Sequence, residues 1–297
     1  MKLGRTVCPT QRKRTPLKGT NPKPLAMDLL ETLTETTQHV KATITPLIKT
    51  PLAQKTYGTG AGGDPKKHID MQAEKAIIET LTEHGLSFTL ISEETGIKTY
   101  GQDPTVYVTT DPLDGTTNTL RGIPFACTSI AISKTPNLDT LQAAAVADLF
   151  HDATYLAQRN LGSYRNYQKI TPAKTDNLAE AVIGLDLNTY KATELAEKLN
   201  QLLTQTKHIR HLGANALELC YVADGTTDAF IDLRGKLRTT DMAAATLIIQ
   251  EAGGTITTPQ NTPLTNPLSP TETVDFIAAG NTGLHQAILE TLRKAQA

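Results

Sequence analysis

The residues best suited to chemistry stand together at positions 111–118, which read Asp-Pro-Leu-Asp-Gly-Thr-Thr-Asn. Asp111 and Asp114 are three residues apart and follow an apolar stretch that predicts a strand over 104–110. Gly115 permits a tight bend, and the polar residues after it suit the first turn of a helix. Carboxylates bind cations and the free amides of a helix start bind anions, so the stretch predicts a site for a phosphate group and a metal ion. A solvated turn is the alternative, because turns use the same residue types.

Acids elsewhere in the chain could complete such a site. Glu93 and Glu94 follow a short apolar strand predicted over 88–92, and Asp70 opens a helix predicted over 70–84. Each has a plain structural alternative, which is solvation for the two glutamates and an N-terminal cap for Asp70. The glutamates gain a function only if another acidic strand end lies beside them, and Asp111 is the candidate.

Asp241 stands at the head of a nearly apolar helix predicted over 240–251. The helix dipole favours a carboxylate at this end, and an N-terminal cap is the structural alternative. Small residues at 243–245 allow this helix end to pack closely against another backbone. That packing would present the Asp241 carboxylate in a shared cleft.

Composition narrows the class of protein. The chain has 297 residues, of which 39% are hydrophobic, enough for a large core in one domain or in two closely packed halves. The net charge of −1 provides no field for nucleic acid or a membrane surface. Cys8, Cys127 and Cys220 are too few and too scattered for a disulfide framework or a zinc site, which suits a reducing cytoplasm. No apolar run is long enough to span a bilayer, and the start lacks the apolar core of a signal peptide.

The chain divides into three parts by composition. Residues 1–26 are basic, contain no acid and predict a disordered extension. Residues 27–165 predict two long helices and antiparallel strands, and residues 166–297 predict alternating helices and strands. The glycine-rich segment 58–64 has two interpretations, a mobile flap over a site or a flexible linker.

Taken together and in order, three motifs resemble the inositol monophosphatase and fructose-bisphosphatase superfamily. They are Ser-Glu-Glu at 92–94, the acidic string at 111–118, and Asp-Met-Ala-Ala-Ala followed by Glu-Ala-Gly-Gly within 241–254. The resemblance covers residue 27 to the end. It implies an α+β fold, a layered α-β-α-β-α sandwich, usually found as a homodimer. It also implies a metal-dependent, often lithium-sensitive phosphatase.

The resemblance implies two or three bound Mg²⁺ ions, with Mn²⁺ as an alternative. Glu93, Asp111 and the carbonyl of Leu113 would hold the first ion, and Asp111, Asp114 and Asp241 the second. Glu93 and water would hold a third, weaker ion. The residues by themselves agree, because clustered acids need cations between them and all-oxygen ligands favour Mg²⁺ or Mn²⁺ over zinc.

By the same resemblance, Asp70 and Thr116 would orient the attacking water, and the backbone N–H groups of Gly115 and Thr116 would bind the phosphate. Glu94 would stand behind the ligands. No Cys or His is placed for a covalent phosphoenzyme, so direct attack by water is the simpler mechanism.

The substrate is less determined, because the chain departs from the animal members of the superfamily. Thr240 stands where those enzymes have a Trp, and Asp232 is a candidate for the Glu that contacts the inositol ring. The sequence Gly-Lys-Leu-Arg at 235–238, shortly before Asp241, is more similar to that of archaeal enzymes. Those enzymes commonly act on fructose 1,6-bisphosphate and inositol 1-phosphate. A second phosphate needs cations, for which Arg165 and Arg210 are the first candidates, followed by Arg234, Lys236 and Arg238.

These observations predict a Mg²⁺-dependent phosphatase of fructose 1,6-bisphosphate, inositol 1-phosphate or both. The expected partner is a small sugar or inositol phosphate, with neither nucleic acid nor membrane, and the expected assembly is a homodimer. A 3′(2′),5′-bisphosphate nucleotidase is the close alternative, disfavoured by the scarcity of aromatic residues for base stacking. A non-catalytic metal- or phosphate-binding regulator is the other, disfavoured by the intact set of acids.

Overall fold

The larger of two main β-sheets carries most of the predicted acids. The computed structural model of the protein describes residues 25–188 and 195–294. Eight strands form this sheet in the order β10-β9-β8-β7-β6-β5-β3-β4. Their bounds are β3 (Phe88–Ser92), β4 (Gly96–Tyr100), β5 (Val106–Asp114), β6 (Cys127–Ser133), β7 (Leu141–Asp148), β8 (Thr154–Gln158), β9 (Gly162–Arg165) and β10 (Gln168–Lys169).

A second large sheet, a two-stranded hairpin, seven α-helices and two 3₁₀ turns, at Thr45–Leu47 and Leu138–Thr140, complete the described part of the chain. The sheet has the order β12-β11-β13-β15-β14, with β11 (Val182–Leu185), β12 (His208–Arg210), β13 (Ala229–Asp232), β14 (Thr255–Thr257) and β15 (Phe276–Ala279). The helices are α1 (Leu25–Ile44), α2 (His68–Glu83), α3 (Thr116–Arg121), α4 (Leu195–Gln205), α5 (Asn215–Ala223), α6 (Thr239–Ala252) and α7 (Thr282–Lys294).

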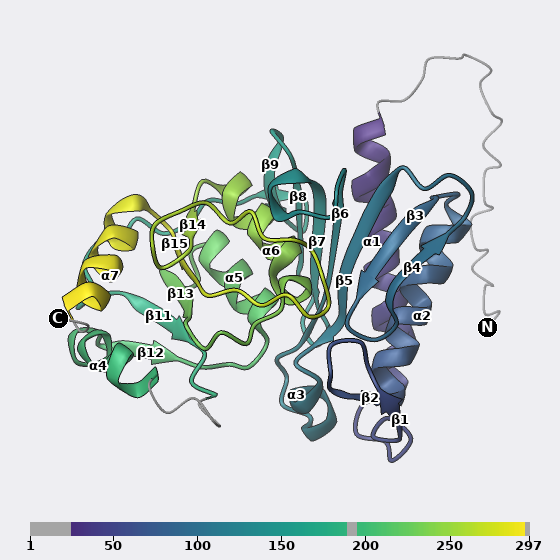
Figure 1. Cartoon of the computed structure of the whole chain (residues 1–297), viewed down its shortest axis with the longest axis horizontal. Coiled ribbons are helices and arrows are strands. Elements are labelled where there is room, and N and C mark those ends of the chain that lie inside the picture. Colours follow the sequence, from purple (N-terminus) through teal and green to yellow (C-terminus); the bar gives the residue numbers. More distant parts are fainter. Residues whose placement is uncertain (1–24, 189–194, 295–297) are drawn as a thin grey trace, which may run out of the picture.

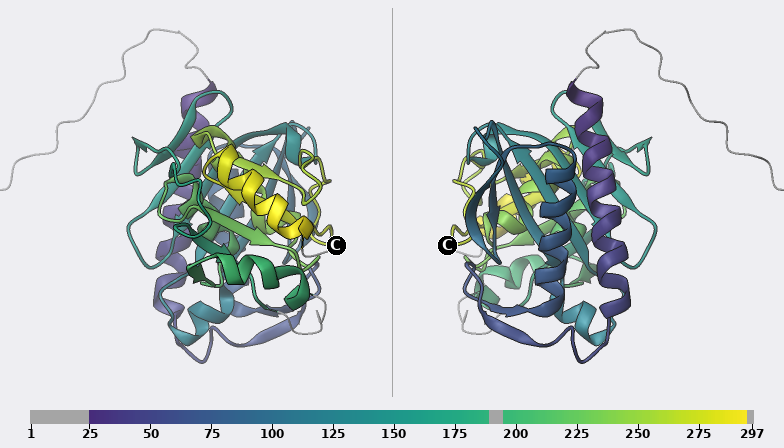
Figure 2. Two further views of the ribbon diagram at one scale, coloured as in Figure 1. Left: turned by 90° about the vertical axis from the view of Figure 1, so that its left-hand side faces the viewer. Right: turned by 90° about the vertical axis from the view of Figure 1, so that its right-hand side faces the viewer.

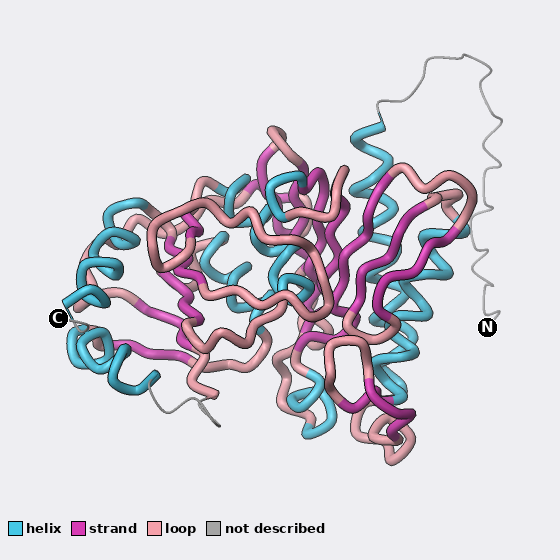
Figure 3. The backbone as a smooth tube through the Cα atoms, in the orientation of Figure 1, coloured by secondary structure: helices cyan, strands magenta, loops and turns pink. Residues whose placement is uncertain are grey.

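Helices and sheets alternate in five layers (Figures 1 and 3). Helices α1 and α2 lie side by side on the outer face of the larger sheet, α5 and α6 fill the space between the sheets, and α4 and α7 cover the far face of the smaller sheet (Figure 2). Three clusters of buried apolar residues join neighbouring layers. The predicted α-β-α-β-α sandwich and α+β class are confirmed.

Strands β3 and β5 determine where the first acids meet. They are parallel, with Phe88 opposite Val106 and Ser92 opposite Thr110. The carboxyl ends of parallel strands lie at one edge of a sheet, so Glu93 emerges beside Asp111. Strand β5 continues past its predicted end, and its pairing with β6 shifts register between Asp111 and Asp114. Pro112 lies within this irregularity, as expected of a residue that cannot donate a ladder hydrogen bond.

The middle layer depends on the small residues of α6. Residues 242–249 of this helix are all buried, because one side faces the larger sheet and the other faces the smaller one. Ala243, Ala244 and Ala245 have no exposed surface. Side chains of this size let the helix backbone approach both sheets closely, which confirms the prediction of a closely packed helix end at Asp241.

The predicted glycine-rich segment forms the turn of a short antiparallel hairpin, β1 (Thr56–Thr59) and β2 (Pro65–Lys67). Helix α1 ends at Ile44 and the chain continues as a 3₁₀ turn over Thr45–Leu47, which contains Pro46. A proline cannot donate the next helical hydrogen bond, which accounts for the end of α1.

The predicted three-part division is not tested by this arrangement, although the larger sheet extends to Lys169, slightly beyond the boundary placed at 165. Residues 1–24 of the predicted basic extension lie outside the described residues. Across the described ranges, every helix is too short or too polar to cross a bilayer.

Overfilling the middle layer should destabilise the fold. Ala244→Leu adds three carbon atoms to a site with no exposed surface, and we expect a loss of about 1–3 kcal/mol in the free energy of unfolding. Urea denaturation followed by circular dichroism measures it. Gln250→Leu, at an exposed position of the same helix, is the matched control. Equal effects of the two substitutions would contradict the close packing of this helix.

Candidate active site

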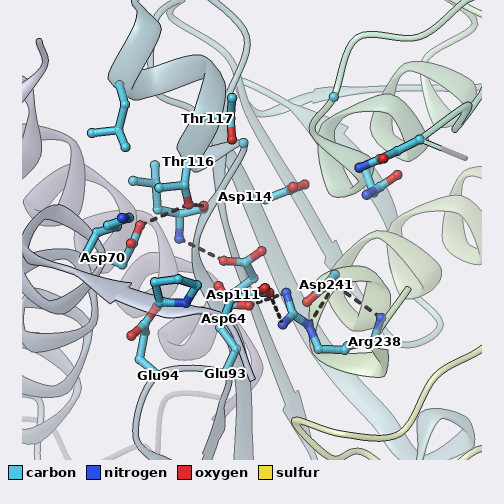
Figure 4. A pocket seen from close by; sticks show the side chains of 18 residues that line it. Asp64, Asp70, Glu93, Glu94, Asp111, Asp114, Thr116, Thr117, Arg238 and Asp241 are labelled. Carbon is cyan, nitrogen blue, oxygen red and sulfur yellow. Dashed lines mark hydrogen bonds and ion pairs between the residues drawn. The ribbon is translucent and has the colours of Figure 1, made fainter. Parts of the chain in front are cut away.

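A cavity of about 430 Å³ opens where the larger sheet, the hairpin and the middle helices meet. The side chains drawn in Figure 4 point into it from elements far apart in the sequence. Its acidic members are Asp64, Asp70, Glu93, Glu94, Asp111, Asp114 and Asp241. The sequence analysis named six of these acids as members of the site, and the folded structure adds Asp64.

Glu93, Asp111 and Asp241 form the centre of the cavity. Each offers one carboxylate oxygen, and these three oxygens lie within 4.8 Å of one another. Two of the residues come from the ends of parallel strands, and the third from the first turn of α6, which faces that sheet edge. The closeness of the three acids is therefore a product of strand order and helix packing.

Charge repulsion makes this cluster unstable as three bare anions. At an effective dielectric constant of about 20, two like charges at this separation repel by roughly 3.5 kcal/mol. Three such pairs cost roughly as much as the whole stability of a typical domain. Burial, followed by the charges of the neighbouring acids, raises the pKa of Glu93 and of Asp111 well above the ordinary range. The cluster thus requires protons or cations.

Arg238 supplies part of the required positive charge. Its guanidinium lies 2.5 Å from Glu93 Oε2, and its Nε lies 3.3 Å from Asp241 Oδ2. The same group reaches the hairpin, 2.9 Å from Asp64 Oδ2 and 3.3 Å from the carbonyl oxygen of Gly62. Burial works against this charge, but Asp241, Glu93 and the other nearby acids raise the pKa of Arg238. One arginine thus joins α6, the end of β3 and the hairpin.

The packing of the hairpin against Arg238 requires glycine at position 62. A Cβ at Gly62 would lie 2.5 Å from Arg238 Nη1 and 3.2 Å from Glu93 Cβ. The backbone N–H of Gly62 donates to the carbonyl of Glu93 at 2.8 Å. The structure places Gly62 and Asp64 of segment 58–64 in contact with charged residues of the site, as the flap interpretation expects of its position. The mobility of this segment stays a prediction.

Asp114 lies on the side of the cavity formed by α5. Its Oδ2 accepts the backbone N–H of Ala216 at 2.7 Å and lies 3.7 Å from the thiol of Cys127. Burial and the charge of Asp241 raise the pKa of Asp114 to about 8. Burial also raises the pKa of the Cys127 thiol, which keeps it protonated. The candidate ligands that line the cavity are therefore oxygens, because the nearby Cys127 is a neutral thiol.

Thr116 and Asp70 meet on the opposite side. Thr116 Oγ1 lies 3.1 Å from Asp70 Oδ1 and 3.0 Å from the carbonyl oxygen of Leu113, and its single proton serves one acceptor at a time. Burial raises the pKa of Asp70 to about 7, although the hydrogen bond from Thr116 lowers it. Gly115 has φ of +91° at the start of α3, as predicted for the bend.

Glu94 stands beside this pair rather than in the central cluster. Burial, then the charges of Asp70 and Glu74, raises its pKa to about 8. Its Oε2 is buried without a hydrogen-bond partner among the described residues. The placement agrees with a position behind the ligands.

Three predicted substrate contacts lie outside the cavity. Asp232 has no exposed surface and accepts hydrogen bonds from Arg234. Arg165 pairs with Asp224 at 2.9 Å. Arg210 is exposed on β12, where its Nη1 donates to the neighbouring carbonyl of Ile209. None of the three lines the cavity of the acidic cluster, and their contact with a substrate stays a prediction. Spacing along the chain does not show which partner a charged side chain finds.

Sequence reasoning named Arg238 only as a cation for a second phosphate and did not name Asn215 at all. Both line the cavity. A signal for Arg238 was present, because it stands three residues before Asp241, and its backbone N–H donates to Asp241 Oδ2 in a capping box. No comparable signal marked Asn215.

The residues present suit a divalent cation. The candidate ligands are carboxylate oxygens and the carbonyl oxygen of Leu113. The oxygens of Glu93, Asp111 and Asp241 lie close enough together to share one ion. Hard oxygen ligands without thiolate or imidazole are the set that Mg²⁺ and Mn²⁺ prefer. Repulsion among the carboxylates of the cluster favours the binding of such an ion.

The layered fold and the oxygen-lined cavity define the class as a metal-dependent phosphatase. The sequence matches the inositol monophosphatase family over residues 28–297. The chain belongs to that family, and the prediction of a phosphatase is confirmed.

Similar proteins agree with this assignment. A fructose-1,6-bisphosphatase/inositol-1-monophosphatase of Methanothermobacter thermautotrophicus is 33% identical over 86% of this chain and 93% of its own. A bifunctional NADP phosphatase/NAD kinase of Methanococcus maripaludis is 34% identical over 78% of this chain but only 43% of its own. A crystal structure of an inositol monophosphatase-fructose 1,6 bisphosphatase is 27% identical, with a TM-score of 0.78, over 88% of this chain and 98% of that one.

Without a divalent cation, the protein should lose stability as pH rises. The pKa values of Asp70, Glu94 and Asp114 are raised to about 7, 8 and 8 in the folded chain, whereas carboxyl groups of an unfolded chain titrate near pH ~4. The folded state therefore binds more protons than the unfolded state in this window, and the free energy of unfolding falls as pH rises from about 4 to 8.

Urea denaturation in EDTA at several pH values measures this loss. Added Mg²⁺ should restore stability most at the alkaline end of the window, where the carboxylates are charged. Asp111→Asn removes one charge from the cluster, so this variant should lose less stability with rising pH. A wild-type protein that becomes more stable with rising pH in EDTA would contradict the role given to the buried acids.

Proposed function

We propose that this chain is a Mg²⁺-dependent phosphomonoesterase that acts on fructose 1,6-bisphosphate, inositol 1-phosphate or both. The observation that carries the proposal is the convergence of Glu93, Asp111 and Asp241 in the cavity that also holds the Thr116–Asp70 pair. The names of the archaeal relative and of the similar crystal structure support this choice of substrates. Mn²⁺ is the alternative ion.

The residues have separable roles in the proposed reaction. Glu93, Asp111 and the Leu113 carbonyl would hold one ion, and Asp111, Asp114 and Asp241 a second. A bound divalent cation would neutralise charge on the phosphate and on the leaving alkoxide.

Asp70 and Thr116 would orient a water molecule for attack on phosphorus, with Asp70 accepting its proton. A pKa of about 7 suits Asp70 to this task near neutral pH. The backbone N–H groups of Gly115 and Thr116, at the start of α3, would hold the phosphate oxygens.

A second cavity beside the first leaves room for the rest of the substrate. It measures about 490 Å³, and its cationic residues are Arg234, Lys236 and Arg238. No aromatic side chain is among the described residues that line either cavity. A nucleotide would therefore lack a stacking partner, which favours a sugar or inositol phosphate. The NADP phosphatase relative keeps a nucleotide as the second candidate.

The setting of the enzyme is also part of the proposal. We infer a cytoplasmic homodimer that engages neither nucleic acid nor membrane. The near-neutral net charge of −1 supports the absence of polyanionic partners, and the family resemblance supports the dimer. Analytical ultracentrifugation tests the assembly, and a monomer at micromolar concentration would overturn it.

Phosphate release tests the substrate. We expect turnover of fructose 1,6-bisphosphate and inositol 1-phosphate with Mg²⁺, abolished by EDTA and restored by excess Mg²⁺, because the cluster needs a cation to hold an anionic ester. NADP⁺ and adenosine 3′,5′-bisphosphate serve as comparison substrates. Turnover of the nucleotides alone would replace the sugar-phosphate proposal, and EDTA-resistant turnover would overturn the metal dependence.

Removing the Thr116 hydroxyl tests the assignment of the attacking water. Thr116→Ala removes the hydrogen bond to Asp70, and we expect kcat to fall by about 10²–10⁴-fold, as for other groups that position or transfer a proton. Thr116→Ser should retain most of the activity. Thr82→Ala, which removes an exposed hydroxyl of α2, is the control. An undiminished kcat in Thr116→Ala would remove this residue from the mechanism.

A further inference from the structure

Asn118 is the last residue of the string 111–118, and the proposed reaction gives it no role. It lies on α3 and is buried. Its Nδ2 donates to the carbonyl oxygens of Phe125 and Leu212, at 2.8 Å each. A carboxamide nitrogen carries two hydrogens, so these two bonds use both of them. Leu212 is 94 residues further along the chain, which makes Asn118 a bridge between distant segments at one side of the cavity.

A second side chain holds the same distant segment. Glu218, on α5, accepts through Oε1 the backbone N–H groups of Leu212 at 3.1 Å and of Gly213 at 3.0 Å. Only 3% of the surface of Glu218 is exposed. Burial raises the pKa of Glu218 to about 7, although these two hydrogen bonds lower it. Both bonds therefore favour the ionised carboxylate.

Residues 212 and 213 are thus gripped from both sides, and we call this arrangement the 212–213 clamp. The Asn118 amide binds the Leu212 carbonyl, and the Glu218 carboxylate binds the N–H groups. The close approach favours glycine at position 213, because a Cβ there would lie 3.3 Å from Asn118 Nδ2. Gly213 also has φ of +85°, in the left-handed region that glycine enters most easily.

The clamp stands directly before two amides that act on Asp114. Asn215 is the first residue of α5, and the backbone N–H of Ala216 donates to Asp114 Oδ2 at 2.7 Å. A hydrogen bond from the Asn215 backbone also lowers the pKa of Asp114, against the larger effect of burial. A displacement of the clamped residues would therefore move the amides that orient this carboxylate.

The clamp has no direct access to the reacting groups. Gly213 lines the cavity of the acidic cluster, but neither the Asn118 nor the Glu218 side chain does. Any effect of these two side chains on the chemistry must pass through the backbone that they hold. The nearest proposed metal ligand on that route is Asp114.

We propose that Asn118 and Glu218 are positioning residues for the metal site, because their clamp fixes the Asp114 carboxylate and so sets the affinity for the ion that it would hold. This inference rests on the proposed function and deepens its metal dependence. Side chains that orient metal ligands without touching the ion commonly govern metal affinity. Neither residue contacts the substrate or takes part in the bond-breaking step.

Binding of Mn²⁺ tests the proposal without any substrate. Electron paramagnetic resonance of the free ion gives the dissociation constants at pH 8, where the Glu218 carboxyl is mostly ionised. In Glu218→Ala and in Asn118→Ala we expect the Kd of at least one bound Mn²⁺ to rise about tenfold, the lower end of the range for groups that orient ligands. Glu218→Gln keeps an oxygen that accepts both N–H groups and should retain most of the affinity.

Two residues with the same kind of bonds elsewhere provide matched controls. The Glu251 carboxylate also accepts two backbone N–H groups, those of Asn160 and Gly162. Asn281 Nδ2 also donates to the carbonyl oxygen of a distant segment, that of Thr175 at 2.8 Å. Neither residue lines the cavity. Glu251→Ala and Asn281→Ala should lower the free energy of unfolding and leave the Mn²⁺ dissociation constants unchanged.

The outcomes are distinct for proteins that circular dichroism shows to be folded. An unchanged Kd in Glu218→Ala or Asn118→Ala overturns the role of that residue, and an equal rise in the control variants overturns the clamp as its cause. If Glu218→Ala does not fold, Glu218→Asp, which withdraws the carboxylate by one methylene, replaces it with the same two outcomes. A wild-type protein that binds no Mn²⁺ would overturn the metal dependence and this inference together. Binding by the wild type keeps the metal dependence, whatever the variants show.

Discussion

Repulsion among carboxylates at one sheet edge is the constraint on which the rest of the site depends. Glu93, Asp111 and Asp241 place three oxygens within 4.8 Å, at a cost that approaches the stability of a domain if all three remain charged. The surrounding structure meets that cost in two ways, through Arg238 and through a geometry suited to divalent cations. A rigid framework is required, because the acids would separate if the chain could relax. The parallel pair β3–β5 and the buried helix α6 provide it.

Arg238 both offsets the charge of the acidic cluster and holds the β1–β2 hairpin beside the cavity. Its guanidinium extends from the acids to Gly62 and Asp64, so the hairpin lies against the cluster. The glycine at position 62 is explained by this contact, since any Cβ there would collide with the guanidinium. Charge compensation and loop placement are thus carried by one side chain.

The two neighbouring cavities separate the acidic cluster from the space that would hold the rest of a substrate. The acidic part contains the groups that any phosphate ester requires. The neighbouring part contains carboxamides, hydroxyls and a lysine, without the aromatic surfaces that a base would need among the described lining residues. Its two arginines are engaged by Asp64, Asp186, Asp232 and the cluster, so a simple count of basic residues overstates the positive charge offered to a ligand.

The sequence by itself determined the chemistry of the site and the class of fold. The eight residues 111–118, with Glu93 and Asp241, predicted a phosphate and metal site and, through their resemblance to a known family, a phosphatase. The nearly apolar composition of residues 240–251 predicted the buried helix. Tertiary structure alone decided which charges meet. The sequence placed Arg165 and Arg210 ahead of Arg238 as cations for the substrate, yet of these three only Arg238 reaches the cluster. Asp232 proved to be buried and bonded to Arg234, and only the fold shows that Asn215 lines the cavity. The physical reason is that local patterns specify residue type and backbone bends, whereas the partner of a long polar side chain depends on strand order and helix packing between distant segments.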